Sequence, residues 1–236
     1  MTIFGSPHRH LAECTSTNDE ARDWARDASN FAPSGALVSG DSQTHGRGQR
    51  GREWQGGVGD SALLSYIYRP ESTSEIRELG LVTALAVADA LTVGTSLSPQ
   101  IKWPNDILLD NHKVAGILVE AAEGVVILGI GVNVNQEHFP GAEGFAYPPT
   151  SLRLATGQPQ QVSIIQAAVS QALSRWEGEW LRVGFLPIIE ECRRRLAIDV
   201  EVRRGPDLAT LTGLTDDGFA HVRLPDGTFA IWSTVD

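Results

Sequence analysis

The chain has 236 residues, a net charge of −10 and 42% hydrophobic residues, a composition typical of a globular protein that buries a full core. The acidic balance disfavours sequence-independent binding to nucleic acid, and no apolar run approaches the ~18 residues of a membrane span. Cys14 and Cys192 form no CxxC pair, so we expect free thiols in a reducing cytoplasm. His8 and His10 are interpreted as part of a solvated terminus rather than as metal ligands.

The first half of the chain predicts two helices and two strands. Residues 16–28 are predicted to form a helix, because Ala21, Trp24, Ala25 and Ala28 make one apolar stripe. Thr17 with Glu20 matches a capping box at its start. Strands are predicted at 36–38 and 62–68, on either side of a loop rich in glycine and arginine. An apolar helix is predicted at 75–93.

The second half predicts a β region, two helices and a β meander. The expected strands lie at 100–103, 107–109, 114–120 and 125–134, with a hairpin turn at Asp110-Asn111-His112. Helices are expected at 163–183 and 186–196. After residue 198, short strand-like runs are separated by Asp217-Gly218 and Asp226-Gly227, which are strong hairpin signals. The sequence therefore predicts an α+β domain followed by a small, barrel-like β domain.

The segment 46–54, GRGQRGREW, predicts an anion-binding loop. Residues 46–51 match G-x-G-x-x-G, but polar residues precede them and a glycine-rich stretch follows, so the strand–helix context of a dinucleotide-binding fold is missing. Glycines let backbone N–H groups converge on an anion, and arginines add planar donors suited to phosphate or carboxylate. The alternative is a solvated basic surface loop.

Residues 128–135 alternate strictly between two faces of a predicted strand. Leu128, Ile130, Val132 and Val134 form an apolar face, and the opposite face carries Gly129, Gly131, Asn133 and Asn135. Glycines in a strand are usually explained by close approach of a ligand or another backbone. We therefore predict a ligand-binding floor, with sheet-on-sheet packing as the alternative.

Three charged residues, Lys102, Asp106 and Lys113, cluster within twelve positions beside this floor. A two-residue turn at Asn111-His112 would place Asp106 about four residues along the strand from Lys113, or ~13 Å. We therefore expect no simple ion pair between them, although a long ligand would reach both. Each charge taken singly would be ordinary surface decoration.

Five motifs together resemble the biotin protein ligases, and in the order and spacing of that family they cover nearly the whole chain. They are Ser16-Thr-Asn18, Gln43 with GRGQRGREW, KWPNDI (102–107), KVAGILVE (113–120) and GIGVNVN (129–135). The resemblance implies an α+β fold with a class II synthetase-like catalytic domain at 1–190, built on a mixed β-sheet with helices on one side. An SH3-like β-barrel domain would follow at 191–236.

The reaction implied by the resemblance has two steps. Biotin and ATP give biotinyl-5′-adenylate and pyrophosphate, and a lysine of the biotin carboxyl carrier protein then takes the biotinyl group. Because the carboxylate and the polyphosphate repel each other, the enzyme has to offset their charges. ATP with Mg²⁺ and biotin are therefore the implied small molecules.

The resemblance also implies roles for individual residues. Arg47, Lys113 and Asp106 would be catalytic, with Asp106 also the Mg²⁺ ligand. Biotin would be bound by Ser16, Thr17, Asn18, Gln43, Arg47, Gly48, Gln49, Lys113 and Gly116. The nucleotide would be bound by Arg50, Arg52, Trp54, Lys102, Asn105, Gly131 and Asn133. For Thr17 helix capping is an equal alternative, and for Arg50 and Arg52 loop solubility is the alternative.

Two departures from relatives shape the remaining expectations. Gln49 stands where the family loop often has arginine, so we expect weaker retention of the adenylate. Only about 15 residues precede Ser16, so we expect ligase activity without a DNA-binding domain or operator binding. Family members frequently dimerise through the sheet, so a homodimer is possible. A lipoate–protein ligase and a non-catalytic interaction module remain the rival interpretations, and a nucleic-acid binder or membrane protein is disfavoured.

Overall fold

The computed structural model describes residues 1–236 except 55, 73–74, 94, 143–144 and 235–236, and the side chains of Arg50, Glu75 and Ala122 also lie outside the described part. The secondary-structure elements are β1 (His8–Cys14), α1 (Thr17–Arg26), β2 (Leu37–Gln43), η1 (Gln49–Gly51), β3 (Ser61–Tyr68), α2 (Glu75–Ala90), β4 (Gln100–Lys102), β5 (Asp106–Leu109), β6 (His112–Ala122), β7 (Val125–Asn133), α3 (Leu152–Thr156), α4 (Val162–Val183), α5 (Phe185–Arg194), β8 (Val200–Arg204), β9 (Asp207–Leu214), β10 (Ala220–Arg223) and β11 (Phe229–Trp232).

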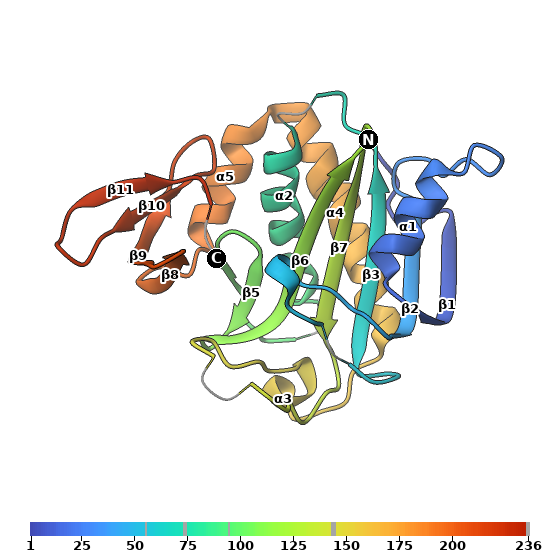
Figure 1. The fold of residues 1–236 in the computed structure, drawn as a ribbon, viewed down its shortest axis with the longest axis horizontal. Helices are drawn as coiled ribbons and strands as arrows, with labels where there is room; N and C mark the ends of the chain where they lie inside the picture. Colours follow the sequence, from blue (N-terminus) through green and yellow to red (C-terminus); the bar gives the residue numbers. More distant parts are fainter. Residues whose placement is uncertain (55, 73–74, 94, 143–144, 235–236) are drawn as a thin grey trace.

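A seven-stranded mixed sheet forms the centre of the molecule (Figure 1). Its order is β1-β2-β3-β7-β6-β5-β4, with β1 parallel to β2 and every other neighbouring pair antiparallel. The long hairpin β6–β7 lies in the middle of the sheet. The predicted α+β class and the strict alternation of β7 are confirmed, since Leu128, Ile130, Val132 and Val134 are all buried in the core.

Helices cover both faces of this sheet. Residues such as Leu37 and Tyr66 pack with α2 and α4, whereas their neighbours Val38 and Ile67 pack with Trp24 of α1. Period-two alternation along a strand requires that these two sets lie on opposite faces. The expectation of helices on one side only was therefore wrong, because the apolar stripe of α1 covers the second face (Figure 1).

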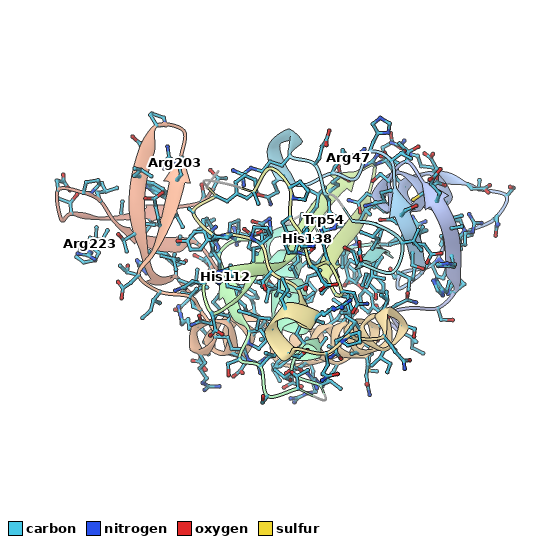
Figure 2. All side chains as sticks on the ribbon, turned by 90° about the horizontal axis from the view of Figure 1, so that it is seen from below. Arg47, Trp54, His112, His138, Arg203 and Arg223 are labelled. Carbon is cyan, nitrogen blue, oxygen red and sulfur yellow. The ribbon has the colours of Figure 1, made fainter. Side chains whose placement is uncertain are left out.

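The C-terminal residues form a four-stranded antiparallel sheet in the order β11-β10-β9-β8. The predicted meander is confirmed, and within the described residues β11 and β8 are the two edges of this sheet. Its Arg203 and Arg223 lie away from Arg47 and Trp54, which lie over the central sheet (Figure 2). The predicted domain boundary at 190/191 falls inside α5, whose Ile188, Ile189 and Cys192 are buried in the same cluster as the central sheet.

A buried hydrogen bond joins the C-terminal sheet to the segment before β5. The Trp103 indole N–H donates to the Gly218 carbonyl at 3.0 Å, and Trp103 is 3% exposed. Main-chain bonds between Ile101 and the segment after α5 run beside it, from Ile101 N to Arg195 O and from Ala197 N to Ile101 O. The C-terminal sheet thus supports the backbone that carries Lys102, Asn105 and Asp106.

Replacing Trp103 with phenylalanine is expected to destabilise the protein, because the Gly218 carbonyl loses its buried donor. The expected loss is about 1–3 kcal/mol in the free energy of unfolding. Denaturant titration measures it, and Trp54→Phe is the matched control, since the Trp54 indole N–H has no partner among the described residues. Equal stability of the two variants would contradict the supporting role of Trp103.

His8 and His10 near the N-terminus are exposed, as expected, but they belong to a strand, β1, where His8 Nε2 and His10 Nδ1 lie 2.8 and 2.9 Å from the buried Ser39 hydroxyl. The expected capping box does not form: Ser16 is the N-cap of α1 and makes no side-chain capping bond. No helix in the described part of the chain is long and apolar enough to cross a membrane.

Candidate functional site

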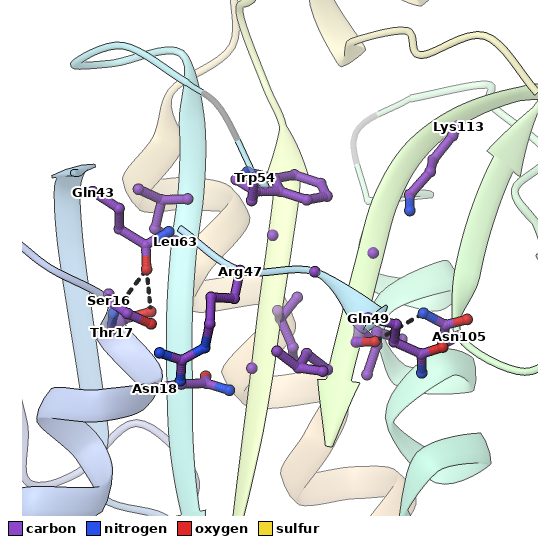
Figure 3. A pocket seen from close by; sticks show the side chains of 17 residues that line it. Ser16, Thr17, Asn18, Gln43, Arg47, Gln49, Trp54, Leu63, Asn105 and Lys113 are labelled. Carbon is purple, nitrogen blue, oxygen red and sulfur yellow. Dashed lines mark hydrogen bonds between the residues drawn. The ribbon is translucent and has the colours of Figure 1, made fainter. Parts of the chain in front are cut away.

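A pocket lies on the face of the central sheet that α1 covers (Figure 3). Its floor is a row across four strands, in which Leu63 pairs with Gly131, Gly131 with Gly116 and Gly116 with Asp106. The two central glycines leave the middle of this row without side chains. The pocket is lined by Ser16, Thr17, Asn18, Gln43, Arg47, Gly48, Gln49, Trp54, Leu63, Asn105, Lys113, Gly116, Ile117, Leu118, Gly129, Ile130 and Gly131.

The start of α1 forms the polar end of the pocket. Gln43, at the end of β2, takes the place of a helix cap: its Oε1 accepts from the Thr17 N–H at 2.7 Å and from the Thr17 hydroxyl at 3.1 Å. The buried Ser65 hydroxyl lies 2.8 Å from Thr17 Oγ1 and donates to Asn18 Oδ1 at 2.5 Å. Because Gln43 satisfies the helix end, the Ser16 side chain is left facing the pocket.

Asn18 lies directly over the floor. Its Nδ2 donates to Glu120 Oε2 at 2.7 Å, and this bond with the Ser65 bond fixes the orientation of the amide. A Cβ on Gly129 would be 2.3 Å from Asn18 Oδ1, so only glycine fits beneath it. The close approach that the β7 glycines predicted is therefore made here by a side chain of α1.

The arginine-glycine segment folds into a small hairpin over the pocket. Trp54 N donates to Gly46 O at 2.9 Å, Gly48 N donates to Arg52 O at 2.7 Å, and Gly51 adopts a positive φ of 74° at the tip. The Gly48 N–H thus pairs within the hairpin and is not presented to an anion. A Cβ on Gly46 would be 2.4 Å from the Trp54 carbonyl oxygen, so the base of the hairpin requires glycine.

Trp54 lies on the glycine row. A Cβ on Gly131 would be 2.5 Å from Trp54 Cε2, and one on Gly116 would be 3.0 Å from Trp54 Cζ3. The indole Nε1 is buried without a hydrogen-bond partner among the described residues, so it is available to an acceptor on a bound molecule. The glycines of β6 and β7 therefore form a shelf for an aromatic ring, which Figure 3 shows above the floor.

Lys113 and Asp106 form an ion pair, contrary to the expected separation. Lys113 Nζ lies 2.6 Å from Asp106 Oδ1. The β5–β6 register shifts at Val114, with Leu108 opposite Lys113 and Ile107 opposite Ala115, and this bulge puts Lys113 on the same face as Gly116. A Cβ on Gly116 would be 3.2 Å from Lys113 Nζ, so the lysine side chain crosses the bare glycine to reach Asp106.

Lys102 joins the same cluster from β4. Its Nζ lies 3.7 Å from Asp106 Oδ2 and 5.0 Å from the Tyr147 ring centroid, and desolvation by burial lowers the pKa of this lysine. Lys102 and Lys113 are the only lysines in the chain. Asn105 is held in place by its Nδ2, which donates to Ile117 O at 3.0 Å. One end of the pocket is thus cationic, with a single carboxylate between two amines.

Arg47 does not face this cationic end. Its guanidinium donates two bonds to Asp19, from Nη1 at 2.5 Å and from Nη2 at 2.7 Å, on the side of the pocket where α1 begins (Figure 3). The Arg47 hydrogen bond lowers the pKa of Asp19. In this structure the Arg47 side chain thus lies at the α1 end of the pocket and Lys113 at the other end, and the catalytic role expected for Arg47 stays a prediction.

The remaining predicted site residues have a less direct connection with the pocket. Arg52 is exposed near Lys102, and the Arg50 side chain lies outside the described residues. Asn133 Nδ2 donates to Thr150 O, and Asn135 Nδ2 donates to Gly59 O and Gln160 O, all at 2.9 Å. These two amides therefore hold loops at the end of β7.

Comparison with known proteins decides the family. Residues 11–137 match the family model described as biotin/lipoate A/B protein ligase. A biotin–[acetyl-CoA-carboxylase] ligase of Paracoccus denitrificans is 35% identical over 92% of this chain and 94% of its own. The chain belongs to the biotin/lipoate A/B protein ligase family. The sequence-based identification of a biotin protein ligase is confirmed.

Two further relatives agree with this assignment. The bifunctional ligase/repressor BirA of Bacillus spizizenii is 32% identical over 87% of this chain and 67% of its own length. The biotin protein ligase of Aquifex aeolicus, solved in complex with biotin and ATP, superposes with a TM-score of 0.84 at 27% identity, covering 97% of this chain and 96% of that one. The relatives share the α+β fold with its large mixed sheet.

Sequence reasoning missed the apolar lining residues Leu63, Ile117, Leu118 and Ile130 and, beside the pocket, the polar residues Asp19, Ser65 and Glu120. Asp19 lies in the first turn of α1, where the helix dipole alone is enough to explain an acidic residue. The alternation of β3 places Ser65 on the face opposite the buried Tyr66, and Glu120 lies on the pocket face of β6 opposite Ile127. The alternation of side chains along β3 and β6 is therefore sufficient to predict that Ser65 and Glu120 face the pocket.

Proposed function

We propose that the protein catalyses ATP-dependent biotinylation of a lysine on a carrier protein through biotinyl-5′-adenylate. A biotin carboxylate oxygen forms a bond to the α-phosphorus of ATP, and pyrophosphate leaves. The lysine amine of the carrier then attacks the activated carbonyl carbon, AMP leaves, and the amine loses a proton. Both steps require a carboxylate or acyl group beside phosphate, with positive charge nearby.

The main support for this proposal is that the two ends of the pocket differ in charge. Hydroxyl and amide groups of Ser16, Thr17 and Asn18 gather at one end, and the two lysines around Asp106 gather at the other. A long molecule with a neutral polar ring and a terminal carboxylate fits that gradient. We assign the biotin ring to the start of α1 and its carboxylate to Lys113.

The nucleotide is assigned to the region of Trp54 and the second lysine. The Trp54 ring lies on Gly116 and Gly131, and its N–H has no hydrogen-bond partner among the described residues, which supports an acceptor-bearing ligand beside this ring. Asn105 and Lys102 lie on the same side, and the pKa of Lys102 is lowered chiefly by burial, with the charges of Lys113 and Arg52 acting in the same direction. ATP is the ligand that supplies both a ring and phosphates, as in the Aquifex aeolicus ligase solved with biotin and ATP.

Magnesium is proposed only as the ion that accompanies ATP. Among the described residues no group of three His, Cys, Asp or Glu side chains is placed to hold a metal. Asp106 is the one carboxylate between the two lysines, which suits an ion that takes one or two protein carboxylates and otherwise phosphate and water. Bound Mg²⁺ would neutralise phosphate charge, and we route no step through it.

Biotin-dependent exchange of pyrophosphate into ATP by the purified chain tests the proposal. We expect exchange that requires biotin and is not supported by lipoate at the same concentration. Exchange with lipoate alone would favour a lipoate–protein ligase, and absence of exchange with either acid would favour an interaction module.

Gln49 leads to a prediction about retention of the intermediate. It lines the pocket at the tip of the hairpin, where relatives often carry arginine. Gln49→Arg adds a cation close to the adenylate phosphate, so we expect the adenylate to dissociate about 10-fold more slowly, the size of one charge-assisted bond. A chase of labelled adenylate from wild type and variant measures this, and equal rates would discard the idea.

The remaining assignments rest on family resemblance and stay proposals. We propose a biotin carboxyl carrier protein as acceptor, division into a catalytic domain and a C-terminal domain, and an SH3-like character for the four-stranded sheet. Free, buried Cys14 and Cys192 support a cytoplasmic location. A homodimer formed through the sheet is likewise a proposal.

A further inference from the structure

Four charged side chains form a closed ring beside the pocket. Arg22 Nη1 lies 2.7 Å from Asp19 Oδ1, and Asp19 Oδ2 lies 2.5 Å from Arg47 Nη1. Glu120 Oε2 closes the ring, 3.5 Å from Arg47 Nη2 and 2.9 Å from Arg22 Nη2. Positive and negative charges therefore alternate around it.

The ring connects three parts of the fold that are distant in sequence. Asp19 and Arg22 belong to α1, Glu120 to β6, and Arg47 to the hairpin of residues 46–54. The ion pair of Arg47 with Asp19 joins this hairpin to α1, and its ion pair with Glu120 joins the hairpin to β6. Glu120 also accepts the Asn18 amide at 2.7 Å, so the same ring fixes a side chain at the polar end of the pocket.

The ring of charges fixes the orientation of the Arg47 guanidinium more than it stabilises the fold. The four side chains are between 24% and 37% exposed, and an exposed ion pair contributes only about 0–1 kcal/mol to folding. A two-bond fork between arginine and carboxylate, however, fixes the direction of the guanidinium plane. The Arg47 charge is thereby matched by carboxylates, and Lys113 and Lys102 remain the cations at the opposite end.

We propose that Asp19 and Glu120 are positioning residues that act through Arg47. They hold the guanidinium against α1, and the hairpin backbone and Trp54 are thereby kept over the glycine floor. In this arrangement Arg47 is an anchor of the hairpin, and Lys113 alone meets the reacting carboxylate. The inference rests on the proposed function and changes the role given to Arg47 within it.

A double-mutant cycle tests the anchor. Asp19→Asn, Arg47→Gln and the double variant are compared by KM for biotin and kcat in pyrophosphate exchange, and by trypsin cleavage after Arg52 in the presence of biotin. Each single variant should raise KM about 10-fold and speed cleavage, with kcat little changed. The double variant should be no worse than the worse single, because both changes remove one interaction.

Controls separate the possible failures. Asp23→Asn removes an exposed acid from the same helix and should change neither KM nor cleavage. Glu120→Gln should resemble Asp19→Asn. Effects of Asp19→Asn and Arg47→Gln that multiply in the double variant would overturn the inference, as would a large fall in kcat for Arg47→Gln with Asp19→Asn unchanged. A wild-type chain that shows no biotin-dependent exchange would instead refute the proposed function.

Discussion

Replacing Lys113 with alanine is expected to slow biotin-dependent pyrophosphate exchange by about 10²-fold or more, the loss typical of removing one group that stabilises developing charge. Lys113 Nζ lies 2.6 Å from Asp106 and 5.9 Å from the Trp54 ring centroid, at the meeting point of the assigned carboxylate and nucleotide. The fall should be in kcat, because the charge that Lys113 offsets is greatest when the two anions join. Initial exchange rates at saturating biotin and ATP measure it.

The control for this variant is a cation on the same face of the sheet but away from the pocket. Arg26, at the end of α1, pairs with Glu123 in the β6–β7 turn and is about half exposed. Arg26→Ala should leave the exchange rate unchanged. A Lys113→Ala variant with a near-wild-type rate would refute the role assigned to that lysine and leave Lys102 as the remaining amine at this end.

Replacing Gly129 with alanine is expected to weaken biotin binding by about 10- to 100-fold, the equivalent of losing a hydrogen bond to a charged partner. The new Cβ would be 2.3 Å from Asn18 Oδ1 and 2.7 Å from Asn18 Nδ2. Asn18 would have to leave both Ser65 and Glu120, and the polar end of the pocket would lose its shape. Calorimetric titration with biotin measures the change.

Gly80 provides the matched control. It lies within α2, and a Cβ added there meets nothing within 4 Å. Gly80→Ala should therefore leave biotin affinity unchanged, and it should stabilise the fold by about 1 kcal/mol because alanine is the better helix former. Unchanged biotin affinity in Gly129→Ala would show that Asn18 does not shape the biotin site.

The floor of the site was predictable because it depends on the two-residue alternation of side chains along a single strand. Strict alternation placed Gly129 and Gly131 on one face of β7, and hairpin pairing then put Gly131 opposite Gly116. The hairpin turn within 110–112 was equally local, but its two central residues, which adopt the positive φ that such turns require, are Asp110 and Asn111 and not the expected Asn111 and His112. β1 was missed because it is an edge strand whose side chains are mostly exposed and show no regular alternation.

Contacts between distant segments were not predictable from spacing. Gln43 caps α1 from 26 positions away, which made the local capping-box interpretation of Thr17 and Glu20 wrong. The two-residue turn lies at Asp110-Asn111 and not at Asn111-His112, so Leu108 is opposite Lys113, and the expected ~13 Å separation of Lys113 and Asp106 becomes an ion pair. The direction of Arg47 depends on Asp19 and Glu120, which the linear motifs do not connect with the hairpin.

A crystal structure of the protein with biotin and a non-hydrolysable ATP analogue tests the central claim most directly. The account predicts the biotin ring beside Ser16, Thr17 and Asn18, the carboxylate within hydrogen-bonding distance of Lys113 Nζ, and the α-phosphate next to it. It also predicts that Arg47 still pairs with Asp19. Biotin bound with its carboxylate away from Lys113, or a nucleotide bound away from Trp54, would contradict it.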